Sequence, residues 1–458
     1  MLPLLFPSAS PTIFPIEQRN FMMKRLISLL LLSLSLPALS TVRIEEELFV
    51  IGQKPEVLKD LIKSGSVEID HVSSNGFELF GPKGLAKHLE EMNIPHFDMK
   101  LINQKAFADY PTSAQFRQQM MNLAGKYPKI MKLYTIGKSN KGNDLLVMKI
   151  SDNVTTDEVE PEFKYISSMH GDEITGRELM MNLISEIGEK YGSDQDITDL
   201  VNNSEIFIMP SMNPDGSDLK QRANAKGADL NRNFPDIKAD TQSSPTGREV
   251  ETQAIMAYQA SRQFVLSANF HGGTVVANYP WDSIYDRHPL NDFVKQLSVE
   301  YAELNPEMRG SSQFPGGVTN GADWYVVKGG MQDWSYFWFK DLQITVELST
   351  TKWPAYSEIA GFYKSNRDSM FHFMKAVHHG AGFKIQRSKA SGTVAIEQIS
   401  PAKSSLGSYA FNDSQFYKVM PEGEYEFTIQ EKNRAAQKIN VKVESNRIKS
   451  NGNYVSVP

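Results

Sequence analysis

The pattern of apolar and polar positions predicts a large α/β domain in the middle of the chain. Between about residues 107 and 385, short apolar runs typical of buried strands alternate with longer segments of helical period. An amphipathic helix is expected after the second run, because apolar residues recur there every three or four positions from Leu179 to Tyr191. This alternation predicts a largely parallel or mixed sheet. The expected strands are 145–150, 163–168, 205–209, 264–270 and 343–348.

Two smaller stretches flank this domain. Residues 41–106 predict a β-α-β-β-α order, with extended segments at 43–52, 66–71 and 76–80 and helices at 55–63 and 84–92. We interpret them as a small α+β module, either prodomain-like or for docking; the alternative is a mere extension of the next domain. Residues 386–458 show short alternating runs separated by turns such as Pro421-Glu-Gly423, which predicts a small β-sandwich.

The first 40 residues have the pattern of an export signal. Lys24 and Arg25 precede an apolar run over 26–39, and Ala38-Leu39-Ser40 provides small residues for cleavage. The run is too short for a transmembrane helix, although an uncleaved anchor is the alternative. We expect the natural start at Met22 or Met23 and a mature protein that is secreted or periplasmic, without a stable membrane anchor.

Composition narrows the chemistry that is available. The chain has 48 Lys and Arg against 54 Asp and Glu, so nothing favours nucleic acid or an anionic membrane as a partner. Cysteine is absent, which excludes disulfides, thiol catalysis and cysteine-ligated metals. An exported protein without disulfides fits bacterial-type export. Any metal must be held by imidazole and carboxylate groups.

A set of metal ligands follows two of the predicted strands. His170 and Glu173 come directly after the strand at 163–168, and His271 follows the strand at 264–270. His and Glu three residues apart could by themselves be a solvated turn. Ligands gather at the carboxyl ends of strands in such sheets, however, so both segments deliver side chains to one edge. Two histidines and one glutamate leave a position open for water, which is the pattern of catalytic zinc.

The segment around these ligands resembles a known family. The string MHGDEITGRELMM, from Met169 to Met181, is similar to the zinc signature of the metallocarboxypeptidases, and in particular of the carboxypeptidase N/E/D branch. Asp172 stands where that branch usually has Asn, at a position that is not a ligand. The resemblance implies one zinc ion per chain, a carboxypeptidase-like α/β domain and a transthyretin-like β-sandwich after it. The module at 41–106 lies outside it.

The resemblance also implies catalytic roles. Glu347, in the ITVEL string of a buried strand, matches the general base, and a carboxylate in an apolar strand is costly unless it has a task. Arg222 matches the arginine that stabilises the oxyanion; the alternative is a basic surface loop. In the string DLNRNFP, Asn231 and Arg232 match the pair that holds the substrate's terminal carboxylate. Asp229 fits a partner that orients a zinc histidine.

Three further residues concern substrate binding. Tyr325 matches the mobile tyrosine that closes over the bound terminal residue. Asp282, in Tyr279-Pro-Trp-Asp282, and Gln332 match the pocket for the last side chain in the branch that prefers basic residues. A buried carboxylate there favours Lys or Arg by charge pairing, whereas a surface Asp is the alternative. Ser335 stands where the family usually has Asn.

These observations leave three hypotheses for function. The first is an exported, monomeric zinc carboxypeptidase that removes C-terminal Lys or Arg from peptides and proteins. The second keeps the metal chemistry but acts on cell-wall peptides or another amide, which would be favoured if Asp282 points away from the cleft. The third is an inactive peptide-binding protein. The remaining pair, His378 and His379, is interpreted as a helix-dipole or surface feature.

Overall fold

The computed structural model describes residues 42–99, 110–444, 448 and 453–458, and residues 41–458 form one compact unit. The predicted export signal lies outside the described residues. Within the described ranges, no helix is long and apolar enough to cross a membrane.

The N-terminal module has the predicted β-α-β-β-α order and one further strand. Its four strands form an antiparallel sheet in the order β2-β3-β1-β4. Leu48, Val50, Leu79 and Leu89 are buried between this sheet and the helices, which gives the module a core of its own. The elements are β1 (Glu46–Ile51), a 3-10 turn (Pro55–Leu58), α2 (Lys59–Ser64), β2 (Glu68–Ser73), β3 (Gly76–Gly81), α3 (Leu85–Glu91) and β4 (His96–Asp98).

The central domain is built on an eight-stranded mixed sheet in the order β11-β10-β12-β9-β7-β8-β6-β5. The five strands predicted from the sequence are β6, β7, β8, β9 and β12. The strands are β5 (Met131–Lys138), β6 (Asp144–Ile150), β7 (Glu162–Ser167), β8 (Glu205–Met209), β9 (Phe264–His271), β10 (Val275–Tyr279), β11 (Val318–Asn320) and β12 (Leu342–Leu348). The helices are α5 (Ser113–Lys126), α6 (Thr175–Lys190), α7 (Gln195–Val201), α8 (Pro214–Leu219), α9 (Val250–Ala260), α10 (Asn291–Leu304), α11 (Pro306–Arg309), α12 (Gly321–Trp324), α13 (Met331–Phe339) and α14 (Ile359–Lys375).

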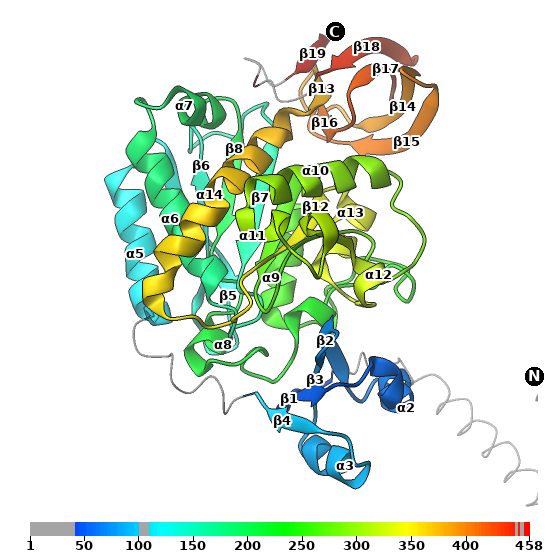
Figure 1. The fold of residues 1–458 in the computed structure, drawn as a ribbon. Helices are drawn as coiled ribbons and strands as arrows, with labels where there is room; N and C mark the ends of the chain where they lie inside the picture. The colour runs from blue at the N-terminus through cyan, green and yellow to red at the C-terminus, as the bar shows by residue number, and fades with distance from the viewer. Residues whose placement is uncertain (1–41, 100–109, 445–447, 449–452) are drawn as a thin grey trace, which may run out of the picture. The chain divides into compact units, whose positions relative to one another are not determined.

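Helices cover both faces of this sheet (Figure 1). Successive residues of a strand point to opposite faces, and the core divides accordingly. Phe163 and Tyr165 of β7 pack with α6, α10 and α14, whereas Ile166 packs with α9 and α13 on the other side. The strands between the edge strands β5 and β11 are therefore buried on both faces, which explains why they read as apolar runs in the sequence.

The C-terminal region consists of two packed sheets, as the β-sandwich prediction requires. The sheets have the orders β16-β13-β19 and β15-β14-β17-β18, and side chains from both, such as Phe383 and Phe427, share one core. The region begins at Gly380, because β13 pairs with β16 and β19. Its strands are β13 (Gly380–Ile385), β14 (Gly392–Ser400), β15 (Ser404–Phe411), β16 (Gln415–Val419), β17 (Gly423–Glu431), β18 (Gln437–Val443) and β19 (Tyr454–Val457).

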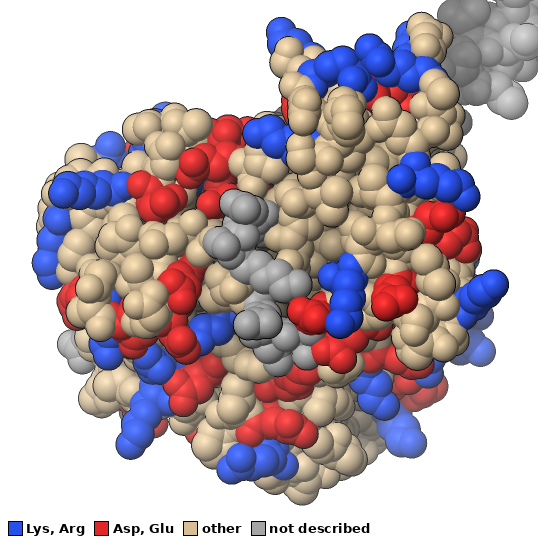
Figure 2. All heavy atoms as spheres, turned by 90° about the horizontal axis from the view of Figure 1, so that it is seen from above, with Lys and Arg blue, Asp and Glu red and all other residues tan. Residues whose placement is uncertain are grey.

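The surface agrees with the balanced composition. Lys and Arg side chains stand among Asp and Glu over most of the face shown in Figure 2.

One prediction is wrong in this part of the chain. His378 and His379 lie at the end of the 3-10 turn that follows α14, but they are buried rather than on the surface. His378 Nε2 lies 2.8 Å from the Ser204 hydroxyl, and burial lowers the pKa of His378 to about 4. A neutral core histidine does not act as a cation at a helix end.

Candidate active site

The site is set up where three parallel strands end side by side. Ser167 of β7 pairs with Phe270 of β9, and His271 at the end of β9 pairs with Glu347 of β12. The chain leaves β7 through a turn that carries His170 and Glu173 and then enters α6. Because the strands are in register, side chains separated by more than a hundred residues reach one edge of the sheet.

The predicted metal ligands meet at this edge. His170 Nδ1 lies 3.0 Å from one carboxylate oxygen of Glu173, and His271 Nδ1 lies 2.8 Å from the other. The two Nδ1 atoms are 3.1 Å apart, and all three residues are buried. Two imidazoles and one carboxylate that present their ligand atoms within 4.8 Å of one another match the donor set that zinc prefers. The residues present therefore fit one zinc ion.

Asp229 and Arg222 hold the metal ligand His170 in place through a chain of hydrogen bonds. One oxygen of Asp229 is 3.0 Å from His170 Nε2, and the other accepts a 2.8 Å hydrogen bond from Arg222 Nε. Burial acts to raise the pKa of Asp229, but Arg222 and His170 hold it well below its usual range. The carboxylate thus stays charged and fixes the ring of His170, which is the orienting contact expected from the sequence.

Gly171 allows the two loops of the site to pack together. A Cβ at this position would lie 2.1 Å from the backbone carbon of Gly216, in the first turn of α8. Gly216 N in turn donates to the Asn213 side chain at 2.8 Å, which fixes the loop that leads to Arg222. Any side chain at 171 would push the Arg222 segment away from the metal ligands.

Glu347 lies beside the ligands as predicted. It is 4% exposed, and its Oε2 atom has no hydrogen-bond partner among the described residues. A buried carboxylate oxygen without a partner is unusual and is typical of functional sites. Glu347 borders the same cavity as His170 and His271.

The residues predicted to hold a terminal carboxylate line that cavity too. Asn231 and Arg232 occupy a 3-10 turn (Leu230–Arg232) that Asp229 caps through the Asn231 N–H, at 2.7 Å. Tyr325 follows α12 and faces the same space. Arg222 is completely buried, so the alternative of a basic surface loop is wrong.

Asp282 borders the cavity, and Gln332 holds its carboxylate in place. Asp282 is 4% exposed and accepts hydrogen bonds from Gln332 Nε2 at 2.7 Å and Asn278 Nδ2 at 3.3 Å. The surface alternative is therefore wrong, and Asp282 borders the cavity rather than pointing away from it. Burial and the carboxylate of Asp333 raise the pKa of Asp282 well above its usual range. A cationic side chain arriving there would supply the charge partner that Asp282 lacks.

The β2–β3 hairpin of the N-terminal module enters this cavity. Asp70 forms a 2.5 Å ion pair with Arg222 and accepts a hydrogen bond from the Tyr325 hydroxyl. The backbone oxygen of Ile69 accepts from Arg232 at 3.0 Å. Burial acts to raise the pKa of Asp70, but Arg222 and His71 hold it well below its usual range, so Asp70 is a carboxylate.

The next hairpin residues contact the other catalytic candidates. His71 Nε2 lies 3.6 Å from Glu347 Oε1, and His71 Nδ1 lies 3.0 Å from Glu78. Glu78 accepts a 2.7 Å hydrogen bond from Lys352, whose ammonium group is 3.6 Å from Glu173. With the hairpin in place the remaining cavity is about 20 Å³, room for roughly one water molecule.

Sequence reasoning missed these contributors. Asp70, His71 and Glu78 lie outside the segment that resembles the family, and Lys352 follows the general-base strand without a recognisable motif. One signal was available: Asp70, His71 and Glu78 fall in two strands expected to form a buried sheet, where three titratable residues are costly without partners.

The metal assignment can be tested by removing one ligand. We expect wild-type protein to carry about one zinc ion per chain, and His271→Ala to bind zinc more than about tenfold more weakly, because an imidazole ligand is lost. His372→Ala is the matched control, since His372 lies on α14 and pairs with Glu300 instead. Elemental analysis and competition with a chelator measure both. Equal zinc affinity in His271→Ala and wild type would contradict the assignment.

Comparisons with known proteins agree with this geometry. The zinc carboxypeptidase family model matches residues 116–369. Carboxypeptidase D of Homo sapiens is 39% identical over 335 residues, covering 68% of this chain and 24% of that protein. Carboxypeptidase SOL1 of Arabidopsis thaliana is 35% identical over 357 residues, covering 75% of this chain and 71% of that protein.

The solved structures extend the likeness to the fold. Carboxypeptidase A from Helicoverpa armigera superimposes with a TM-score of 0.57 at 17% identity, covering 71% of this chain and 95% of that one. The chain spans about a quarter of the length of the carboxypeptidase D relatives, so their likeness concerns that portion alone. Together, the matched family model, the sequence identities and the His-Glu-His site show that the chain belongs to the zinc carboxypeptidase family.

Proposed function

We propose that the chain is a zinc carboxypeptidase that hydrolyses the C-terminal peptide bond of exported peptides or proteins and prefers a terminal Lys or Arg. One observation carries the proposal. A single cavity is bordered by two metal ligands, the general-base candidate, the carboxylate anchors and the specificity residue: His170, His271, Glu347, Asn231, Arg232, Tyr325 and Asp282. An exopeptidase could work with these side chains in the positions that they already occupy.

Each residue has a task that its position supports. A zinc ion bound by His170, Glu173 and His271 would polarise the scissile carbonyl and acidify a water molecule. Glu347 takes a proton from the attacking water and delivers it to the leaving amine. Arg222 donates to the oxygen on which negative charge develops.

The remaining residues select a chain end. Arg232 and Asn231 hold the terminal carboxylate through charge-assisted hydrogen bonds, which restricts cleavage to the last peptide bond. Tyr325 covers the bound residue. Asp282 pairs with the ammonium or guanidinium group of the substrate side chain, and Gln332 and Asn278 orient the Asp282 carboxylate.

The alternatives from the sequence are less well supported. A cell-wall or other amide substrate was favoured if Asp282 pointed away from the cleft, whereas Asp282 borders it. An inactive binding protein would be expected to lack a ligand or the general base, and both are present. A transthyretin-like class for the C-terminal sandwich and export by the N-terminal segment stay predictions.

We further propose that the N-terminal module keeps the enzyme latent. Asp70 pairs with Arg222 and accepts a hydrogen bond from Tyr325. The backbone oxygen of Ile69 accepts a hydrogen bond from Arg232, and His71 lies 3.6 Å from Glu347. A substrate needs the same four partners, so it cannot bind while the hairpin is seated. Displacement of the hairpin is then the activating step.

Latency predicts that hairpin substitutions increase activity. In the full chain, Asp70→Ala with His71→Ala should raise kcat/KM for a peptide ending in Arg by at least about tenfold, because two charged contacts that seat the hairpin are lost. Asp60→Ala, on the exposed side of α2, is the control and should match wild type. Latency would be wrong if wild type already cleaved as fast as the double variant; absence of cleavage in every variant would instead count against the peptidase proposal.

If Glu347 is the general base, its replacement should lower turnover while the zinc ion stays bound. In the Asp70→Ala, His71→Ala background, Glu347→Gln should keep zinc but lower kcat by about a hundredfold or more, since the amide cannot accept the proton. Glu397→Gln, exposed on β14, is the matched control. Kinetics and elemental analysis on the same preparation separate the two effects. Turnover close to that of the background would refute the role of Glu347.

The specificity assignment predicts a change in a ratio. In the same background, Asp282→Ala should lower kcat/KM for terminal Arg relative to terminal Leu by about tenfold or more, because the charge partner is removed. Asp286→Ala, an exposed residue of the same loop, should leave the ratio unchanged. Peptides that differ only in the last residue provide the measurement. An unchanged ratio in Asp282→Ala would exclude it as the specificity residue.

A further inference from the structure

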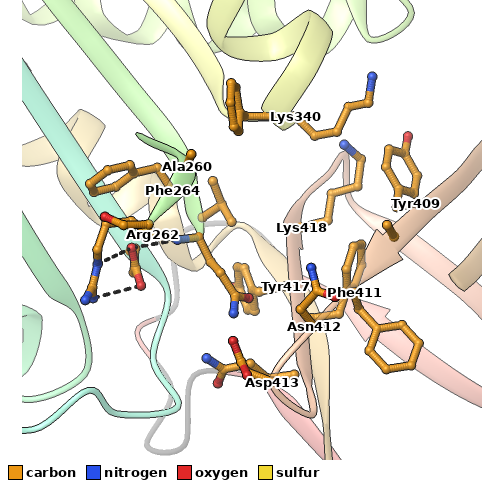
Figure 3. A pocket seen from close by; sticks show the side chains of 18 of the residues that line it. Ala260, Arg262, Phe264, Lys340, Tyr409, Phe411, Asn412, Asp413, Tyr417 and Lys418 are labelled. Atoms are coloured by element: carbon orange, nitrogen blue, oxygen red, sulfur yellow. Dashed lines mark hydrogen bonds and ion pairs between the residues drawn. The ribbon is translucent and has the colours of Figure 1, made fainter. Parts of the chain in front are cut away.

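A second, larger cavity lies where the central domain meets the β-sandwich. Its volume is about 440 Å³, which falls in the range of small-molecule sites. One wall comes from the end of α9, the start of β9 and the end of α13, and the other comes from β15 and β16 (Figure 3). The aromatic side chains of Phe264 and Phe411 border it.

The charges that line this cavity are equal in number but unevenly distributed: the acids are Asp157, Glu162 and Asp413, and the bases are Arg262, Lys340 and Lys418. At one end, Asp157 and Glu162 each lie 2.9 Å from Arg262, so the cation there already has carboxylate partners. At the other end stand two lysines, Lys340 and Lys418, from different domains (Figure 3). Within the described ranges, neither lysine forms an ion pair with a carboxylate, and both ammonium groups lie near aromatic rings.

Lys418 is the more unusual of the two. It lies on β16 and is 4% exposed, and its ammonium group lies over two aromatic rings. The Nζ atom is 4.5 Å from the centre of the Tyr409 ring and 5.3 Å from that of Tyr336. Buried cations are normally paired with a carboxylate, because removal from water is costly.

Lys340 brings a second positive charge to the same place. Its Nζ is 5.5 Å from the centre of the Tyr336 ring, so both ammonium groups approach one aromatic side chain. Lys340 Nζ donates one hydrogen bond to the Phe337 carbonyl, at 2.8 Å, and its other N–H groups can donate to a ligand. Burial and the nearby Lys340 lower the pKa of Lys418 to about 7, which is the effect of a cation without a counter-charge.

We infer that this cavity is a binding site for a small anion, whose carboxylate or phosphate head is held between Lys418 and Lys340 and whose body lies against the aromatic wall. An anion would supply the missing charge partner to both lysines at once. Because Lys418 belongs to the sandwich and Lys340 follows α13, the bound anion would also link the two domains. The inference does not depend on the peptidase proposal.

Calorimetric titration of the full chain tests the site. The probes are inorganic phosphate and 3-phenylpropionate, at constant ionic strength. We expect at least one to bind wild type saturably at one site, and Lys418→Met and Lys340→Met each to weaken it by at least about tenfold. Lys384→Met, an exposed lysine of the sandwich, is the control and should bind as wild type does. Circular dichroism confirms folding, and the more exposed Lys340 guards against a folding defect at Lys418.

The outcomes show which kind of anion binds and whether the proposed site exists. Tighter binding of phosphate points to a phosphate head, and tighter binding of 3-phenylpropionate points to a carboxylate with an apolar body. No binding of either probe would overturn the inference. Undiminished binding in both lysine variants would also overturn it, because it would place the anion elsewhere, such as at the active-site arginines.

Discussion

The active site depends on one buried guanidinium, that of Arg222. It is completely buried and packs on the Phe80 ring, with its carbon 4.6 Å from the ring centre. A charge in that position must be neutralised by neighbours, and the chain supplies Asp229, Asp70 and Glu173. These acids come from three different segments, so the requirement to neutralise Arg222 draws the carboxylate anchor turn, the metal ligands and the N-terminal hairpin to one point.

This requirement explains why a separate module can enter the site so completely. Burial acts to lower the pKa of Arg222, but the surrounding carboxylates raise it well above its usual value. Without Asp70, part of that compensation would be missing until a substrate placed negative charge nearby. This electrostatic demand makes Arg222 a strong attachment point for an acidic residue of its own chain, here Asp70.

The sequence predicted the fold and the site to different depths. Parallel strands with two buried faces read as apolar runs, so β7, β8, β9 and β12 were found, and His170, Glu173, His271 and Glu347 follow from their ends and from the family motif. The seated hairpin could not be predicted, because Asp70 and His71 acquire meaning only through contacts with residues about 150 to 280 positions away. The burial of His378 was missed for the same reason: its partner, Ser204, lies far away in the sequence, directly before β8.

The hairpin contacts one group of the site residues and leaves the surroundings of Asp282 to the central domain. It contacts Arg222, Arg232, Tyr325 and Glu347, to which the proposed function assigns tasks common to all substrates, whereas the hydrogen bonds to the Asp282 carboxylate come from Asn278 and Gln332 of the central domain. If the proposed function holds, contacts to these common residues are enough to exclude every substrate, whatever its last side chain. The hairpin would then need no basic residue in the Asp282 pocket.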